Sequence, residues 1–193
     1  MYEESIRLPL MMRGPNVPRG RKVNGLTAVV DLAPTIVEYA KAAAGRDMDG
    51  RSLMPLLKGD RSGWRTQILL EAAAGGQPVP HPSVRGIRSS AFTYLQHETG
   101  EGELYNFETD SCHAADPFQL ESQHANPCYK KTLRRLRNDL EALKTCNGAT
   151  SSTANADATR PASTLAGRRR TKAACRKAAI TNARTAEGDA PVL

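Results

Sequence analysis

The sequence predicts an α/β fold, or an α+β fold if the chain is classified by itself as a fragment. Three observations support this prediction. Apolar residues alternate with other residues near the start of the chain, and the same period of two returns between residues 84 and 107. A helical repeat of leucines then runs through residues 129–143. We therefore expect a mixed first part, then a small antiparallel sheet with a packed helix, and a tail outside the core.

The first predicted element is a strand over residues 6–12. Its alternating apolar residues are Ile6, Leu8, Leu10 and Met12. Gly14 and Pro15 end the run. Because Pro9 cannot donate a ladder hydrogen bond, the strand should be short, lie at a sheet edge or begin at Pro9.

Two helices are predicted next. In the first, Asp31 is a candidate cap, Pro34 lies in the first turn and Gly45 is placed to end the helix. Its expected buried face consists of Leu32, Ile36, Ala40 and Ala44, with Ala33 and Val37 beside it. In the second, Gly50 provides a turn, Ser52 a cap, and three leucines form an apolar patch: Leu53, Leu56 and Leu57.

Short strands are predicted for the middle of the chain. Trp64 anchors a buried strand over residues 67–71, and a Gly/Pro-rich loop over residues 72–83 marks a domain boundary. Three further strands are expected at residues 84–88, 91–97 and 103–107. Gly100 and Gly102 would supply the positive φ angles of a hairpin between the last two strands.

The last predicted helix begins at Asn126, a good cap followed by proline, and ends at Asn147-Gly148. Its apolar side chains recur every three or four residues, at Tyr129, Leu133, Leu136, Leu140 and Leu143. This seam should lie across the small sheet. Arg137 and Glu141 are spaced to form an exposed ion pair worth about 0.3 kcal/mol.

Residues 148–193 are predicted to be a disordered basic tail with a transient helix over residues 171–185. They contain few large apolar residues, so burial cannot offset the entropy of ordering them. After Asn147 there are eight Lys or Arg against three Asp or Glu, a net charge of +5, so the remaining residues carry only +2 of the total +7. The tail cluster consists of Arg168, Arg169, Arg170, Lys172, Arg176 and Lys177. It could bind polyanions weakly, or simply be solvated.

Several stretches resemble one enzyme family. Tyr2-Glu3, Glu4-Ser5, Arg7 and Pro9 resemble the segment that follows the catalytic centre in sulfatases of the alkaline-phosphatase-like superfamily. Similar family segments are Asp31–Ile36, Met48–Asp60 and the pattern from Val84 to Asp110. The resemblance covers about residues 1–147. It implies that residues 1–71 complete the large α/β domain and that residues 83–147 form the small C-terminal subdomain.

The resemblance also implies an activity, sulfuric ester hydrolysis of the arylsulfatase type, and a location, since the family is usually secreted, periplasmic or lysosomal. The sequence shows no secretory signal. The family nucleophile is a Cys or Ser in the pattern C/S-x-P-x-R that matures to formylglycine and acts with calcium. None of the four cysteines fits that pattern, and no serine does. The family's sulfate-binding lysine would precede Tyr2. We therefore assign no catalytic, cofactor-binding or metal-binding residue, and expect this chain alone to be inactive towards a sulfate ester.

Other clusters allow alternative functions. Cys112, His113, His124 and Cys128 could bind zinc, although their spacing matches no common zinc motif. The other possibilities are a Cys112–Cys128 or Cys128–Cys146 disulfide, or free thiols; Cys175 has no assigned state. His81 and His97 are interpreted as solvated, and Glu3 with Glu4 as a solvated turn rather than an acid/base pair. The alternative function is a non-catalytic scaffold whose basic tail binds polyanions.

Overall fold

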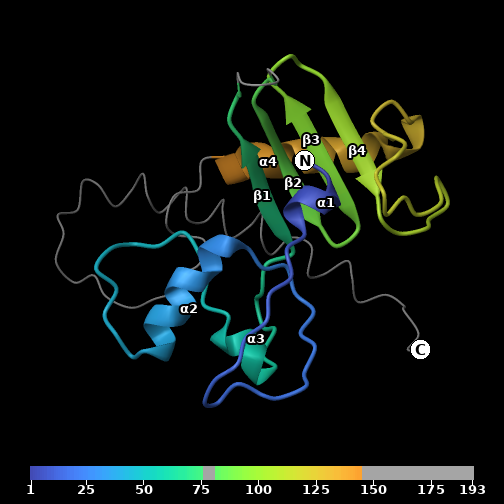
Figure 1. The fold of residues 1–193 in the computed structure, drawn as a ribbon. Helices are drawn as coiled ribbons and strands as arrows, with labels where there is room; N and C mark the ends of the chain where they lie inside the picture. Colours follow the sequence, from blue (N-terminus) through green and yellow to red (C-terminus); the bar gives the residue numbers. More distant parts are fainter. Residues whose placement is uncertain (76–80, 145–193) are drawn as a thin grey trace. The chain divides into compact units, whose positions relative to one another are not determined.

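The computed structural model describes residues 1–75 and 81–144, which form two compact units (Figure 1). The first unit comprises Met1–Met11 and Gln67–Lys144. Within the described residues, the second comprises Met12–Thr66. The predicted tail over residues 148–193, with its transient helix and its basic cluster, lies outside the described residues.

The first unit is built on a four-stranded antiparallel sheet. Its strands are β1 (Gln67–Ala72), β2 (Val84–Ser89), β3 (Phe92–His97) and β4 (Gly102–Asn106), and they lie in the order β1-β2-β3-β4. The predicted strands and the hairpin between β3 and β4 are confirmed. Gly100 adopts the expected positive φ of 92°. Gly102 does not: it is the first residue of β4, and its missing side chain leaves room for the ring of His124.

The strand predicted at residues 67–71 is present as β1. β1 pairs with β2 along its whole length, from Gln67 opposite Ser89 to Ala72 opposite Val84. β1 therefore lies in the same compact unit as β2, β3 and β4. Backbone pairing with β2 satisfies the donors of β1, which is why the strand belongs with the small sheet.

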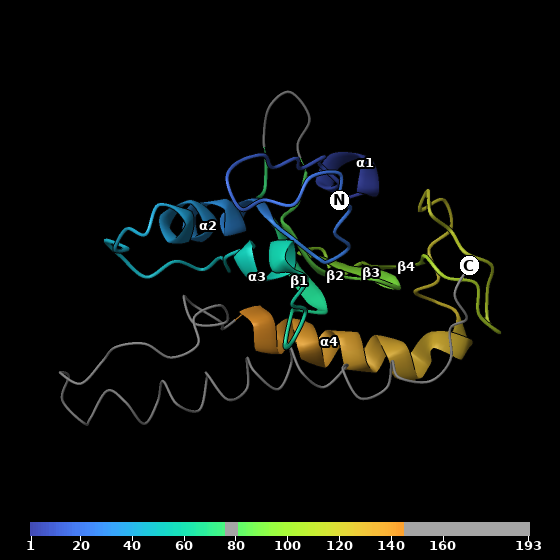
Figure 2. The ribbon, with the colours of Figure 1, turned by 90° about the horizontal axis from the view of Figure 1, so that it is seen from below.

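A long helix covers one face of this sheet. The 3₁₀ turn Pro127–Tyr129 leads into α4 (Lys130–Lys144), and the Asn126 side chain accepts a hydrogen bond from Cys128 N–H at 3.0 Å, as expected of a cap. Figure 2 shows α4 along one side of the sheet and α1 (Glu3–Ile6) on the other. The core between α4 and the sheet consists of Ile87, Tyr94, Leu104, Tyr129, Leu133, Leu136 and Leu140. The predicted leucine seam is therefore confirmed.

The prediction of an Arg137–Glu141 ion pair within α4 is wrong. Arg137 does not bind Glu141; its Nε donates to the Tyr94 hydroxyl at 3.1 Å, and its Nη2 lies 3.0 Å from His124 Nε2. Glu141 instead accepts a hydrogen bond from Lys144 Nζ at 2.6 Å. A sheet tyrosine within reach of the guanidinium therefore replaces the local helical partner.

The second unit contains a 3₁₀ turn (Val29–Asp31), α2 (Leu32–Tyr39) and α3 (Met54–Lys58). Asp31 was expected to cap the helix. Instead its fully buried carboxylate accepts hydrogen bonds from Ala28 N–H at 2.8 Å, Arg51 N–H at 2.7 Å and the Arg65 guanidinium at 2.6 Å. Three segments far apart in sequence are therefore held together by one carboxylate. Gly50 is required here because a β-carbon would collide with the Val30 carbonyl.

Two predictions for α2 are wrong. The helix ends at Tyr39, with Lys41 at φ 53°, rather than continuing to Gly45. Its buried side is polar: Thr35 is 1% exposed, whereas Ile36 on the predicted face is 66% exposed. The reason is that the Thr35 hydroxyl accepts a hydrogen bond from Leu53 N–H at 2.9 Å, which turns this side of α2 towards α3.

The strand predicted over residues 6–12 is also wrong. The chain forms α1 up to Ile6 and then continues without regular structure through Met12. A strand needs a neighbour to accept and donate its ladder hydrogen bonds. No strand of residues 1–75 or 81–144 pairs with this segment, and its apolar residues are exposed: Leu8 by 65%, Leu10 by 47% and Met11 by 92%.

Candidate functional site

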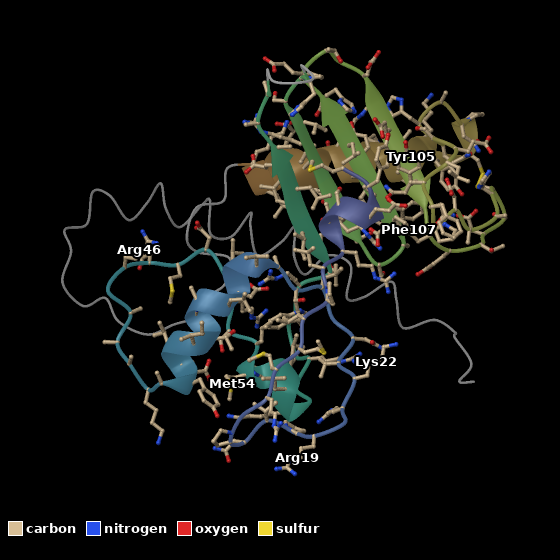
Figure 3. The ribbon with its side chains drawn as sticks, in the orientation of Figure 1. Arg19, Lys22, Arg46, Met54, Tyr105 and Phe107 are labelled. Atoms are coloured by element: carbon tan, nitrogen blue, oxygen red, sulfur yellow. A yellow bond between two sulfur atoms is a disulfide. The ribbon has the colours of Figure 1, made fainter. Side chains whose placement is uncertain are left out.

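The sheet face opposite α4 binds the first residues of the chain. Strand register places Arg88, Thr93 and Tyr105 in one row across β2, β3 and β4. Because side chains alternate along a strand, this row points away from the face that holds Ile87, Tyr94 and Leu104. Residues 1–6 cross it, and Figure 3 shows Tyr105 and Phe107 beside α1. We call this arrangement the N-terminal clamp, made of Arg88, Tyr105 and Gln119.

An ion pair forms the centre of the N-terminal clamp. Arg88 donates to both carboxylate oxygens of Glu3, at 2.6 Å from Nε and 3.3 Å from Nη2. The two side chains are only 17% and 15% exposed, and the guanidinium also stacks over the Phe107 ring at 4.0 Å. The interpretation of Glu3 as part of a solvated turn is therefore wrong, whereas Glu4 is exposed.

Two further contacts complete the N-terminal clamp. The Tyr2 ring meets the Tyr105 ring edge-on at 6.0 Å between centroids, and Glu3 N–H donates to Gln119 Oε1 at 2.7 Å. Gln119 is 5% exposed and adopts a positive φ of 54°. The buried Gln119 side chain therefore fixes the backbone of Glu3, while Arg88 holds the Glu3 carboxylate.

A carboxylate links Tyr105 to His97. Glu103 accepts a hydrogen bond from the Tyr105 hydroxyl at 2.8 Å, and its other oxygen lies 2.7 Å from His97 Nε2. The pKa of Tyr105 is raised above its ordinary value. Burial is the largest cause, and the hydrogen bond to the Glu103 carboxylate is the next. Tyr105 is therefore a neutral hydrogen-bond donor at any physiological pH. The prediction that His97 is isolated and solvated is wrong; its side chain is only 20% exposed.

A second polar cluster orders the loop after β4. Asp110 accepts hydrogen bonds from the Tyr129 hydroxyl at 2.8 Å, Cys112 N–H at 2.8 Å and Asn106 Nδ2 at 3.0 Å. Burial alone would raise the pKa of Asp110, but these hydrogen bonds, together with one from His113 N–H, lower it. The cluster anchors the loop to Tyr129, in the 3₁₀ turn that leads into α4.

The candidate zinc residues do not form a metal site. Cys112 and Cys128 are joined by a disulfide, one of the alternatives left open by the sequence, so neither supplies a thiolate. His113 lies near Glu121 at 3.4 Å, whereas the ring of His124 stacks on Tyr94. His81 pairs across the loop with Gly75 and is exposed, as expected. Over the described residues, no three His, Cys, Asp or Glu side chains form a metal-binding group.

A family model settles which proteins this fold belongs with. Residues 1–146 match the model described as N-sulphoglucosamine sulphohydrolase, C-terminal. The chain belongs to the sulfatase family. The match covers both units and the N-terminal clamp, and the family resemblance in the sequence is confirmed.

Individual sulfatases agree with this assignment. The chain is 36% identical over 85 residues to the N-acetylglucosamine-6-sulfatase of Bos taurus, covering 43% of this chain and 15% of that protein. It is 28% identical over 149 residues to the N-acetylglucosamine-6-O-sulfatase of Bacteroides thetaiotaomicron, covering 73% of this chain and 25% of that protein. A solved 2-O GAG sulfatase superposes with a TM-score of 0.58 at 25% identity, over 68% of this chain and 28% of that one.

This sulfatase chain therefore spans a quarter or less of the two curated relatives that it matches. The fold of this chain, which includes the small antiparallel sheet, is shared with the solved relative over 68% of the chain. No helix in the described part of the chain is long and apolar enough to cross a membrane.

Sequence reasoning missed the residues of the N-terminal clamp. Glu3 and Arg88 are separated by 85 positions, and Glu3 and Gln119 by 116, so no local pattern connects them. One signal was present: Glu3 follows Tyr2 in a segment that resembles sulfatases. The charged partner of Glu3, Arg88, could be identified only from the folded structure.

Proposed function

We propose that this chain is the C-terminal framework of a sulfuric ester hydrolase that acts on sulfated amino sugars or glycosaminoglycans. The observation that carries this proposal is the family match over residues 1–146. The names of the curated relatives support the substrate class, because both specify a 6-sulfated N-acetylglucosamine. The polypeptide that carries the nucleophile and the calcium ligands must lie outside the residues described here.

The N-terminal clamp gives the framework a defined task. In the family that the sequence resembles, the sulfate-binding lysine lies a few residues before the Tyr-Glu pair that corresponds to Tyr2 and Glu3. Arg88, Tyr105 and Gln119 hold these two residues by an ion pair, a ring contact and a backbone hydrogen bond. We infer that the clamp fixes the course of the chain next to that lysine and so orients its ammonium group towards the substrate sulfate.

The residues present do not fit the family's calcium and formylglycine centre. The described part of the chain brings no three suitable ligands together, and no cysteine has proline two residues later and arginine four residues later. No step of the hydrolysis is therefore assigned to these side chains. The Cys112–Cys128 disulfide supports an oxidising compartment, in keeping with a secreted, periplasmic or lysosomal family.

One experiment tests the framework proposal in two arms. In the first, the purified chain is assayed with a chromogenic aryl sulfate and calcium, and we expect no turnover. In the second, the matched quarter of the Bacteroides thetaiotaomicron relative is replaced by this chain, and we expect the chimera to hydrolyse N-acetylglucosamine-6-sulfate.

The N-terminal clamp is tested in the same chimera. Arg88→Gln should lower kcat because the lysine is no longer held, whereas Arg85→Gln on the same strand should not. Arg85 is a matched control because it makes only an exposed ion pair with Glu71, with both side chains more than half exposed. Turnover by the chain alone, or a folded chimera without turnover, would contradict the proposal.

A further inference from the structure

A basic groove runs beside the first turns of α4, on the side of the first unit away from the N-terminal clamp. Its volume is about 730 Å³, and its polar lining consists of His124, Lys130, Lys131, Arg134, Arg137 and Asn138. No Asp or Glu is among the described residues that line it. Four cations therefore face one opening with no anion to neutralise them there.

The groove cations are available to a ligand. Lys130, Lys131 and Arg134 are exposed, and within the described ranges their side chains form no hydrogen bond or ion pair. Arg137 is exposed but oriented, because its Nε donates to Tyr94 and its Nη2 lies beside His124. The Arg137 guanidinium thus has a fixed orientation, whereas the other three side chains can change conformation to contact a ligand.

These charges do not serve the helix that carries them. Lys130 and Lys131 lie in the first turn of α4, where the helix macrodipole disfavours cations. Lys130 and Arg134, four residues apart, repel one another by about 0.2 to 0.5 kcal/mol, and Lys131 and Arg135 do the same. Since burial of the leucine seam stabilises α4 without them, a ligand outside the chain accounts for the charges better than folding does.

The spacing suits an extended ligand. Lys130, Arg134 and Arg137 fall at i, i+4 and i+7, so they line one side of α4 over about 10 Å at 1.5 Å per residue. A single phosphate or sulfate would engage one or two of them. A chain that repeats its negative charges engages all of them and gains the entropy of the released counterions.

We propose that this groove is a binding site for a sulfated polysaccharide chain. The choice of a sulfated glycan rests on the proposed function, because the relatives act on sulfated sugars. It is favoured over a single-stranded nucleic acid because no Phe, Tyr or Trp lines the groove within the described residues, and the ring of His124 already stacks on Tyr94, so bases find no built stacking platform. The site would keep a long polymer on the enzyme between hydrolytic events.

The test measures binding by the full 193-residue chain without any activity assay. A fluorescent, fully sulfated heparin octasaccharide is titrated at about 50 mM and about 200 mM NaCl. The groove variant is Lys131→Gln/Arg134→Gln. The control is Arg46→Gln/Arg135→Gln, which removes the same two charges from exposed residues outside the groove and leaves the basic tail unchanged.

We expect the groove variant to weaken octasaccharide binding by at least about threefold at the lower salt concentration, since each exposed contact contributes a few tenths to about 1 kcal/mol. The slope of log K against log salt should fall by about one to two. The control variant should bind as the unchanged chain does. Arg134→Lys should retain most of the affinity, and far-UV circular dichroism should show α4 intact in every variant.

Three results would overturn the inference. Equal weakening by the groove and control variants would show that only net charge matters. Unchanged binding by the groove variant would place the contact elsewhere. Tighter binding of a charge-matched oligothymidylate, lost in the same variant, would make the ligand a nucleic acid. None of these results depends on hydrolysis. A negative result in this binding test therefore does not contradict the framework proposal, and an inactive chimera does not contradict the binding of a glycan in the groove.

Discussion

Leu136 provides the most direct test of how α4 is held on the sheet. Its side chain is 0% exposed and lies in the core cluster with Ile87, Tyr94 and Leu104. Leu136→Ala removes three carbon atoms, and the lost transfer free energy at about 0.8 kcal/mol each is about 2.4 kcal/mol. The cavity left behind adds to this, so we expect the free energy of unfolding to fall by about 3 kcal/mol.

The assay is urea unfolding followed by far-UV circular dichroism, to which the fifteen residues of α4 contribute strongly. With an m-value of about 1 to 2 kcal/mol/M, the loss moves the midpoint down by about 1.5 to 3 M urea. The single tryptophan, Trp64, lies in the second unit and donates to the Leu26 carbonyl at 3.0 Å. Its fluorescence therefore reports the other unit, and its transition should not move with that of α4.

A matched control comes from Leu120, which is 83% exposed. Leu120→Ala removes the same three carbon atoms from a side chain that already contacts water, so its midpoint should shift by less than about 0.5 M. If Leu136→Ala and Leu120→Ala had the same midpoint, α4 would not be packed on the sheet through its leucine seam, and the reasoning would be refuted.

Three further predictions concern single contacts. The pKa of Asp110 is lowered in the folded chain, so its contribution to stability is present above the unfolded pKa near 3.8 and is lost as the pH falls through the folded pKa. Asp110→Asn should therefore be less stable than the unchanged chain at pH 7. It should also lose less stability on acidification, as measured by urea midpoints. Reduction of Cys112–Cys128, which closes a loop of 16 residues, should cost about 3 kcal/mol in the same measurement, and an unchanged midpoint would show that the bond does not constrain the unfolded chain. Arg88→Gln should speed amide hydrogen exchange in residues 3–6 by at least about fivefold, because a paired charge of this kind contributes about 1 kcal/mol or more; equal exchange in Arg85→Gln and Arg88→Gln would argue against the N-terminal clamp.

Local patterns predicted the first unit well because its elements satisfy their own requirements. The leucine seam over residues 129–143 works as a helix face in any context that offers an apolar surface, and β3 and β4 are joined by a turn that Gly100 allows. In both cases the information lies within about fifteen residues of chain. The same local patterns could not predict that β1 pairs with β2, because this pairing joins two strands that are separated in sequence by a long loop.

The failures have a common physical origin in partners far away in sequence. The alternation over residues 6–12 is a real strand pattern, yet a strand forms only beside another strand. In α2, Ile36 lies on the face that hydropathy favours, but the buried carboxylate of Asp31 and the hydroxyl of Thr35 orient the helix the other way. Family assignment did not depend on these elements, because the match extends over residues 1–146.

The exposed run from Leu8 to Met11 has a practical consequence for anyone who handles this protein. Uncovered apolar side chains gathered on one short segment form a surface on which identical molecules can associate. Preparations of the chain by itself should scatter light increasingly with concentration, and Leu10→Lys should restore clear solutions by placing a like charge in every copy.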